Sequence, residues 1–294
     1  MPDGYGRSRC PFPPLRRAET PLSVTRCNHY KESMSEAWLE GRTALVTGGS
    51  RGIGRATAAA LVRGGAQVVI TARDQQQLDA VAAEIGHASR GIAADISQPD
   101  DVDALFDAAG PIDILINCAG VIQPIAPVVL SDRDLWRRNL EINLYGPYMT
   151  CRAALPHMLE QGWGRMINVS AGVASGRMAS WSAYSASKAG LETLTKVMAR
   201  EVGEQGVRAN AVRPGIVDTE MQDEIRSTSE HLFGRENLER YRSYKERGVL
   251  RQPEDPAKLI LWVLSPEADD LNGEVLAIDD PETAAKIGLV PIAR

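Results

Sequence analysis

Cysteine and histidine are scarce in this 294-residue sequence, and both are widely spaced. The four cysteines form neither a C-x-x-C pair nor a disulfide-dense pattern, and no secretory apolar segment precedes them. The four histidines lack the spacing of metal ligands. We therefore expect no metal site and no disulfide scaffold, and we expect a reducing cytoplasm. The residues are Cys10, Cys27, Cys118, Cys151, His29, His87, His157 and His231.

Long apolar runs and dense basic clusters are also missing. The longest apolar runs have the length of strands, so no membrane span is expected. The net charge is −5 and Lys and Arg are dispersed, so nucleic acid is not an expected partner. With 44% hydrophobic residues, the chain can bury the core of one large α/β domain, and a second full domain is not expected.

Residues 1–33 differ from the rest of the chain. They contain five prolines, several arginines and few branched aliphatic residues, without periodicity. Such a segment cannot offset its own ordering entropy, so we predict that it is disordered. We interpret Met34 as the natural start and residues 34–294 as a single domain.

From Arg42 onward, short apolar runs alternate with longer amphipathic ones. This alternation predicts a doubly wound α/β Rossmann domain, a parallel sheet with helices on both faces. Ligands of such sheets bind at the carboxyl ends of the strands. The expected strands are 44–46, 67–70, 91–94, 112–116, 165–169 and 207–212, and the expected helices are 53–64, 74–85, 99–108, 132–159 and 181–203.

The first expected strand ends in a glycine-rich turn. Gly48, Gly52 and Gly54 let the backbone turn sharply and approach a pyrophosphate, whose charge the following helix N-terminus meets. The Gly-x-x-x-Gly-x-Gly spacing is one residue longer than the commoner dinucleotide fingerprint. A strand before it and a helix after it supply the required context, so we predict nucleotide binding.

The end of the second expected strand bears on the choice of nucleotide. An acid there would accept the ribose 2′-hydroxyl and favour NAD, but Ala72 and Arg73 occupy the corner. Arg73 and Arg51 can clamp a 2′-phosphate, or both can be solvated loop arginines. Asp74 keeps NAD(H) as an alternative unless it caps the next helix. We predict NADP(H).

A candidate proton-transfer group lies between Ser170 and Lys188. On a helix, Tyr184 and Lys188 are one turn apart and share a face. An adjacent ammonium lowers the phenol pKa from its ordinary value of about 10. Tyr184 would act as the acid and Ser170 as a hydroxyl donor to the same substrate oxygen, polarising a carbonyl as hydride reaches it. The alternative is a half-buried Tyr beside a solvated Lys, because Tyr-x-x-x-Lys is common.

Across about residues 40–280 the chain resembles the short-chain dehydrogenase/reductase family. The resemblance rests on motifs in one order: Thr47-Gly48-x-x-x-Gly52-x-Gly54, Asp95, Asn117-Cys118-Ala119-Gly120, Asn143, Ser170, Tyr184-x-x-x-Lys188 and Pro214-Gly215. It implies about seven strands, a substrate lid at about 216–250, and an oxidoreductase acting on a carbonyl or secondary alcohol, for example a 3-oxoacyl or diketone reductase. It also implies a homotetramer or homodimer built on the helices near 132–159 and 181–203.

The resemblance assigns roles to individual residues. Asn143, Ser170, Tyr184 and Lys188 would form the catalytic set. Asp95 would contact the adenine, Lys188 the nicotinamide ribose and Thr219 the carboxamide, and residues 117–120 would brace the sheet. The expected cofactor contacts are Gly48, Ser50, Arg51, Gly52, Ile53, Gly54, Arg73, Asp95, Ile96, Asn117, Ala119, Gly120, Tyr184, Lys188, Pro214, Gly215, Val217 and Thr219.

Pro147 affects the backbone hydrogen bonding of Asn143, four residues before it. Proline lacks an N–H, so the carbonyl of residue 143 loses its helical donor and can hold a water that extends a proton path from Lys188. The alternative is a simple proline kink.

Some features depart from the family pattern. Cys118 replaces a second Asn, and Ile278-Asp279-Asp280 replaces an Asp-Gly-Gly turn, which leaves the bracing of the loop and the C-terminal contacts open. The segments 218–222, 245–250 and 271–274 weakly resemble sepiapterin and benzil reductases. Ala277 lies near the place of the acid that anchors a pterin, so we do not expect a pterin substrate.

Two other functions are compatible with this fold. A nucleotide-sensing or scaffolding protein would not need chemistry, and the fold alone does not exclude it. The four filled catalytic positions favour the enzyme. An epimerase or dehydratase is less favoured, because little chain follows the sheet to form a substrate domain.

Overall fold

The computed structural model describes residues 38–176 and 178–292, so the disorder predicted for residues 1–33 lies outside the described residues. Seven parallel strands form one sheet in the order β3-β2-β1-β4-β5-β6-β7, which confirms the predicted architecture. The order reverses between β1 and β4, where such sheets bind ligands. The strands are β1 (Thr43–Thr47), β2 (Gln67–Ala72), β3 (Ser89–Ala93), β4 (Ile114–Asn117), β5 (Gly164–Val169), β6 (Val207–Arg213) and β7 (Val275–Ala277).

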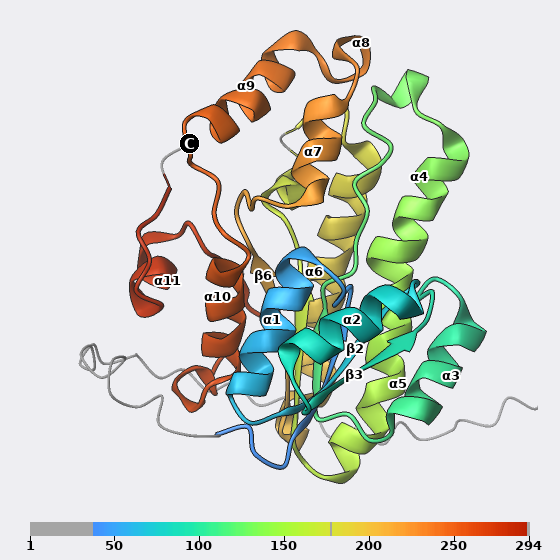
Figure 1. Ribbon diagram of the computed structural model, residues 1–294, viewed down its shortest axis with the longest axis vertical. Coiled ribbons are helices and arrows are strands. Elements are labelled where there is room, and N and C mark those ends of the chain that lie inside the picture. Colours follow the sequence, from blue (N-terminus) through green and yellow to red (C-terminus); the bar gives the residue numbers. More distant parts are fainter. Residues whose placement is uncertain (1–37, 177, 293–294) are drawn as a thin grey trace, which may run out of the picture. The chain divides into compact units, whose positions relative to one another are not determined.

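Helices cover both faces of the sheet (Figure 1). One face packs against α1 (Gly52–Arg63), α2 (Gln75–Ile85) and α10 (Glu254–Leu264), and the other against α3 (Pro99–Ala109), α5 (Gly146–Glu160) and α6 (Ser182–Val202). Alternate residues of β1 enter the two cores: Ala44 and Val46 enter the first, and Leu45 enters the second. The apolar runs of the sequence are continuous because both faces are buried.

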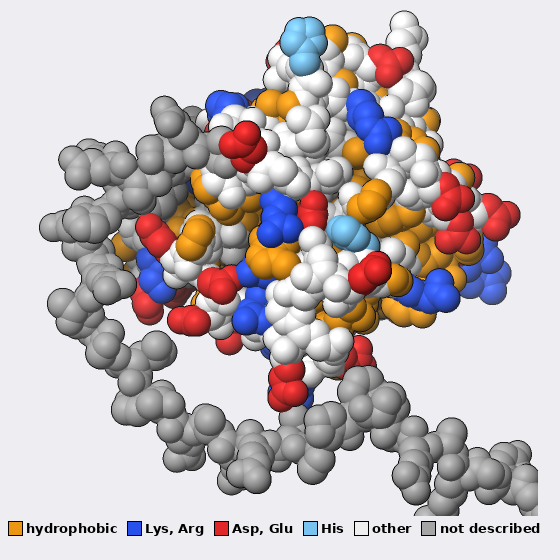
Figure 2. All heavy atoms as spheres, turned by 90° about the horizontal axis from the view of Figure 1, so that it is seen from below, with side chains coloured by type: hydrophobic (Ala, Val, Ile, Leu, Met, Phe, Trp, Pro, Cys, Tyr) orange, Lys and Arg blue, Asp and Glu red, His pale blue; other side chains and the backbone are white. Residues whose placement is uncertain are grey.

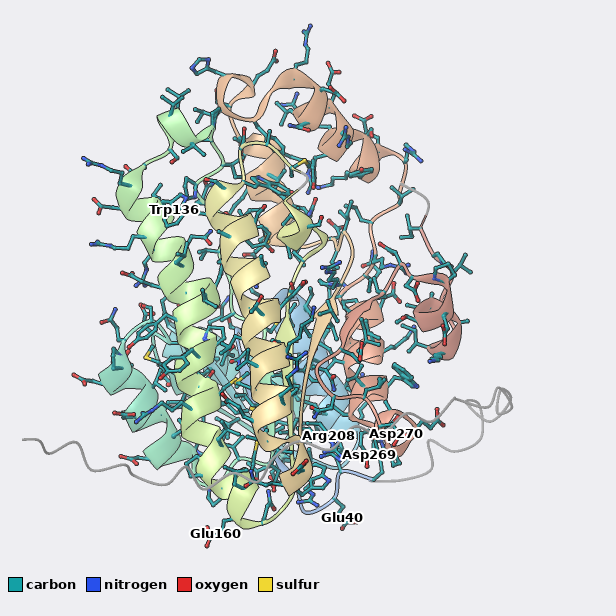
Figure 3. The ribbon with its side chains drawn as sticks, turned by 180° about the vertical axis from the view of Figure 1, so that it is seen from behind. Glu40, Trp136, Glu160, Arg208, Asp269 and Asp270 are labelled. Carbon is teal, nitrogen blue, oxygen red and sulfur yellow. The ribbon has the colours of Figure 1, made fainter. Side chains whose placement is uncertain are left out.

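The helical stretch expected over 132–159 is present, and a π-helical turn divides it into three segments. It consists of α4 (Arg133–Leu140), a π-helical turn (Glu141–Tyr145) and α5. Pro147 cannot supply the N–H that the carbonyl of residue 143 needs in an α-helix, and the wider π turn is the local solution. Within α4, Trp136 Nε1 donates to Ser182 Oγ at 3.1 Å and ties α4 to the start of α6 (Figure 3).

Three helices lie above the carboxyl ends of the strands (Figure 1): α7 (Glu220–Ser227), α8 (Glu230–Phe233) and α9 (Arg235–Glu246). Their aromatic residues pack on Trp181, which stacks on Phe233 with ring centroids 5.5 Å apart and meets Tyr241 edge-on at 5.5 Å. Farther along, α11 (Pro281–Lys286) follows Asp279, which accepts from Arg251 Nη2 at 2.7 Å. Short 3₁₀ turns span Val128–Leu130, Gly172–Ser175, Gly203–Gln205 and Pro266–Ala268.

The amino ends of the strands form the opposite edge of the molecule. There Asp113 accepts from the backbone N–H of Thr43 at 2.8 Å and from Gln161 Nε2 at 2.7 Å. Nearby, Arg208 Nε donates to the carbonyl of Asp269 at 3.1 Å (Figure 3). Seen from this side, acidic and basic side chains are interspersed over the described surface (Figure 2). Among the described residues, no helix combines the length and the apolar character needed to cross a membrane.

Candidate active site

A cavity of about 760 Å³, which we call the glycine-loop cavity, lies at the carboxyl ends of the first four strands. Its wall depends on glycines that approach other backbone closely. Gly48 has φ of 67°, and a Cβ there would lie 2.7 Å from the Cα of Ala119. A Cβ on Gly54 would lie 2.2 Å from the carbonyl oxygen of Gly48. Side chains at these positions would displace the loop, so only glycine allows this path.

The first turn of α1 opens onto this cavity without a side-chain cap. Arg51 precedes the helix and makes no capping hydrogen bond, and no acidic residue lies in the first turn. The first N–H groups of the helix are therefore available to a ligand, and the helix dipole favours a negative charge there. This end of α1 and the glycine cradle fit the pyrophosphate of a dinucleotide.

Two arginines, Arg51 and Arg73, and one acid, Asp74, lie near the corner after β2. Asp74 caps α2 by accepting from the N–H of Gln77 at 3.1 Å, which confirms the capping alternative for this residue. Arg73 is exposed and lines the glycine-loop cavity. Arg51 pairs with Glu220, but both side chains are 59% exposed, so the pair contributes little and can exchange for a ligand.

Asp95 lines the same cavity with its carboxylate held by neighbours. It accepts from Ser97 Oγ at 2.6 Å and from Arg138 Nη2 at 2.5 Å. Burial acts to raise the pKa of Asp95, but the bonds from Ser97 and Arg138 outweigh it and hold the pKa below its ordinary value. The predicted adenine contact at Asp95 stays a prediction. Arg138, which sequence reasoning missed, fixes the orientation of this carboxylate.

A second cavity of about 630 Å³, the tyrosine cavity, contains Ser170, Tyr184 and Lys188 in its wall. Its other described lining is largely apolar or aromatic and includes Ile122, Val173, Met178, Trp181, Ile225, Tyr241 and Tyr244. The two cavities share lining residues at Ile53, Cys118, Gly120, Thr219 and Met221. A ligand that extends from the glycine loop can therefore reach Tyr184.

Burial dominates the electrostatics of Tyr184 and Lys188. It lowers the pKa of Lys188 to about 8. It also raises the pKa of Tyr184 above its ordinary value, with the Cys118 thiol as a smaller cause. The predicted lowering of the phenol pKa by Lys188 is therefore wrong for this structure. Lys188 Nζ lies 5.8 Å from the phenol ring centroid and donates to the carbonyl of Val169 at 2.7 Å.

The hydroxyl of Ser170 donates to a buried carboxylate. Its Oγ lies 2.7 Å from Oε1 of Glu192, and Arg213 donates to both oxygens of that carboxylate, at 2.7 Å from Nε and 2.8 Å from Nη2. Sequence reasoning missed Glu192. A signal existed, because Glu192 lies one turn beyond Lys188 and so shares its helix face.

Asn143 is fully buried and lies outside the lining of both cavities. Its amide accepts from the N–H of Val121 at 2.9 Å, and it donates to the carbonyl of Val121 at 2.7 Å and to Asn139 Oδ1 at 2.8 Å. Asn143 thus fixes the loop after β4 against the π turn. The water-linked proton path from its carbonyl stays a prediction.

Asn117 is likewise buried outside both cavities and braces neighbouring elements. It donates to Asn168 Oδ1 at 2.9 Å and accepts from Thr150 Oγ1 at 2.7 Å. The N–H groups of Cys118 and Ala119 donate to Thr47 Oγ1 at 3.1 and 3.2 Å. These last bonds involve backbone atoms, so the loop keeps its brace although Cys118 replaces the usual Asn.

Comparison with known proteins settles the family. The family model described as short chain dehydrogenase matches residues 42–230. The chain belongs to the short-chain dehydrogenase family. It is 36% identical over 261 residues to "Cis-4-hydroxycyclohexanecarboxylate dehydrogenase" of Sinomonas cyclohexanicum, covering 85% of this chain and 100% of the relative. It is 35% identical over 245 residues to the 3-oxoacyl-[acyl-carrier-protein] reductase FabG of Vibrio harveyi, covering 82% and 97%.

Solved structures of the family agree with this fold. A 3-ketoacyl-(acyl-carrier-protein) reductase from Brucella melitensis, complexed with NADH, has a TM-score of 0.73 and 31% identity, covering 82% of this chain and 97% of that one. This short-chain dehydrogenase is therefore an oxidoreductase that acts on CH–OH or C=O groups with a nicotinamide cofactor. Its two cavities bring together every predicted cofactor residue except Asn117 and every predicted catalytic residue except Asn143.

Proposed function

We propose that this protein is an NADP(H)-dependent reductase of ketones, or dehydrogenase of the matching secondary alcohols, with Tyr184 as its acid and base. One observation carries the proposal: the tyrosine cavity, with Ser170 and Lys188 in its wall, shares lining residues with the glycine-loop cavity. Substrate and cofactor could then meet beside a proton donor. The nicotinamide cofactor, when bound, supplies or accepts hydride.

The residues of the tyrosine cavity divide the proton chemistry between them. Tyr184 is protonated at neutral pH, because a phenol has an ordinary pKa of about 10 and burial raises it further. It can therefore give its proton to the oxygen of a reduced carbonyl. Lys188, with a pKa of about 8, is mostly charged at pH 7 and stabilises the phenolate that forms. Ser170 orients the substrate oxygen beside the phenol.

The corner after β2 supports NADP(H) over NAD(H). Arg73 and Arg51 can each give charge-assisted hydrogen bonds to a 2′-phosphate. Asp74, the acid that would accept a free 2′-hydroxyl, is committed to the cap of α2. The solved relative from Brucella melitensis is a complex with NADH, so the proposal of NADP(H) rests on the residues of this chain and not on that relative.

The tyrosine cavity supports a ring-bearing substrate with a carboxylate. Its walls are aromatic and aliphatic, and the charged side chains among its described lining residues are Lys188 and Arg240, both cations. Arg240 pairs with Glu236 at 3.1 Å, but the Glu236 side chain is 89% exposed, so a substrate anion can replace it at little cost. The Sinomonas relative is named for a hydroxylated cyclohexanecarboxylate, which combines these features.

We also propose a homodimer or homotetramer in the cytoplasm. Tyr145 and Tyr148 are about half exposed and stack with ring centroids 5.9 Å apart, and Val197 is 46% exposed on α6. Exposed apolar side chains on the outer faces of α5 and α6 favour burial against a second copy. Cys118 and Cys151 are free thiols, which fits a reducing compartment.

An NADPH-oxidation screen tests this function. Ketones, diketones, quinones, β-ketoacyl thioesters and keto acids would be offered with NADPH and with NADH, and absorbance at ~340 nm would be followed. We expect turnover of at least one cyclic keto acid, faster with NADPH. Lack of turnover on the whole panel in both directions would contradict the proposal.

A further inference from the structure

A buried carboxylate that belongs to neither the cofactor cradle nor the predicted catalytic set contacts the catalytic serine. Glu192 is 8% exposed and lies on α6, one turn beyond Lys188. Its Oε1 accepts from Ser170 Oγ at 2.7 Å and from Arg213 Nε at 2.7 Å, and its Oε2 accepts from Arg213 Nη2 at 2.8 Å. Side chains from the residue that follows β5 and from β6 therefore meet on one carboxylate of α6.

The charge state of Glu192 determines the direction of its bond to Ser170. Two parallel bonds from one guanidinium favour the ionised carboxylate, and in turn the bonds to Glu192 raise the pKa of Arg213. An ionised carboxylate can only accept hydrogen bonds. At 2.7 Å the hydroxyl of Ser170 must then be the donor, and its lone pairs are left for the tyrosine cavity.

We propose that Glu192, fixed by Arg213, is a positioning residue that holds the hydroxyl hydrogen of Ser170, so that the resting site binds an alcohol more tightly than the matching ketone. An alcohol oxygen can accept from Tyr184 and donate to Ser170 at once. A ketone oxygen only accepts, so it must draw the hydroxyl of Ser170 away from Glu192. This inference rests on the proposed function and adds a preference for one form of the substrate.

The test compares Glu192→Gln with Glu201→Gln, the same change at an exposed position of the same helix. Binding of cis-4-hydroxycyclohexanecarboxylate and of 4-oxocyclohexanecarboxylate would be titrated by tryptophan fluorescence, since Trp181 lines the cavity. One hydrogen bond to a charged group corresponds to roughly tenfold or more in affinity. We expect the parent and Glu201→Gln to bind the alcohol at least ~10-fold more tightly than the ketone, and Glu192→Gln to bind the two within about twofold.

If Glu192→Gln does not fold, the same binding measurements would use the double variant Glu192→Gln/Arg213→Gln, which removes both charges of the Glu192–Arg213 pair. The inference would be overturned if either folded variant kept the parent's preference for the alcohol. It would also be overturned if the parent bound the ketone more tightly than the alcohol, or bound neither compound. Turnover in the screen separates the two claims. A parent that reduces ketones but shows no dependence on Glu192 contradicts the inference alone, whereas a parent without any turnover contradicts the proposed function and the inference together.

Discussion

Tyr184 and Lys188 show how burial competes with charge at single residues. Their spacing predicted a shared helix face, and both line the tyrosine cavity. The spacing could not predict the direction of the phenol pKa, because desolvation depends on the surrounding fold. In this structure burial opposes ionisation of both groups, raising the pKa of Tyr184 and lowering that of Lys188.

The lowered pKa of Lys188 has a consequence for stability. The group has a pKa of about 8 when folded and an ordinary value of 10.5, so between these values the unfolded chain binds more protons. The stability penalty of the buried ammonium is complete below pH 8 and is relieved as pH rises toward 10.5. Relative to Lys188→Met, the parent should gain up to about 3 kcal/mol in its free energy of unfolding over this range.

Denaturant unfolding at a series of pH values measures this gain. Lys196→Met, an exposed lysine on the same helix, is the control and should follow the parent at every pH. Parallel curves for the parent and Lys188→Met would show that Lys188 keeps its ordinary pKa.

The corner after β2 determines which nicotinamide cofactor we expect the protein to prefer. We expect the parent to prefer NADPH over NADH by at least ~100-fold in kcat/KM, about 2.7 kcal/mol, because Arg73 and Arg51 bind the 2′-phosphate. Ala72→Asp combined with Arg73→Gln should reverse the order, since the new acid accepts the free 2′-hydroxyl and repels the phosphate. Steady-state kcat/KM values with NADPH and with NADH measure this preference. Arg63→Gln, a change at an exposed arginine of α1, is the control. Equal use of both cofactors by the parent would mean that Arg73 does not read the phosphate.

The sequence could predict the location of those site residues that come shortly after the end of a strand. Gly48, Asp95 and Ser170 follow three different strands, and parallel strands bring their carboxyl ends to one edge. Glu192 could not be predicted in this way. Its contact with Ser170 depends on how α6 lies against β5 and β6, which is set by tertiary packing rather than by local spacing.

The helical stretch expected over residues 132–159 contains a π turn that the prediction did not include. Its apolar period fits α and π turns equally well over five residues, so the sequence pattern could not separate them. Pro147 carried the only local signal, and it marked the position correctly. The π turn at Glu141–Tyr145 is also where Asn143 enters the core.

For residues 216–250 the family resemblance implied a substrate lid, but it gave no internal structure for helices α7–α9. The aromatic residues of these helices, Phe233 and Tyr241, pack on Trp181, which is distant from them in sequence. A short-range sequence pattern therefore could not predict this aromatic cluster. This cluster forms part of one wall of the tyrosine cavity, to which α9 also contributes Arg240. Helices α7 and α9 therefore contribute both apolar surface and a cation to the tyrosine cavity.

Arg240 tests the role of α9 in substrate choice. Arg240→Gln should raise the KM for 4-oxocyclohexanecarboxylate by about tenfold, because it removes the charge that pairs with the carboxylate. The KM for cyclohexanone should change little. Arg242→Gln, an exposed arginine two residues along α9, is the matched control. Equal effects of Arg240→Gln on the charged and neutral ketones would exclude an anion contact.

At the scale of the whole molecule, the alternation of strands and helices predicted six strands, the faces of the sheet and the edge that binds ligands. The seventh strand, Val275–Ala277, followed only from the family resemblance, because three residues carry no measurable period. The parallel direction of all seven strands brings the glycine loop and the tyrosine cavity to the same edge, where the strand order reverses between β1 and β4.

One surface substitution tests the proposed homodimer or homotetramer. Val197→Asp places a charge on the outer face of α6, where we expect a second copy to pack, and should reduce the mass measured by light scattering coupled to gel filtration. Val290→Asp, at a residue that is 80% exposed, should leave the mass unchanged. A monomeric parent, or a Val197→Asp variant with the parent's mass, would contradict an interface on α6.

Turnover of Tyr184→Phe tests whether Tyr184 is the proton donor of this active site. The substitution removes only the hydroxyl, which lies 4.0 Å from Met221 Sδ, so the melting temperature and cofactor affinity should stay nearly unchanged. Tyr148→Phe, on the exposed face of α5, is the control and should keep the parent's rate. We predict that Tyr184→Phe lowers kcat by ~10²–10⁴ on a ketone that the parent reduces. A folded Tyr184→Phe variant with the parent's turnover would show that Tyr184 is not the proton donor.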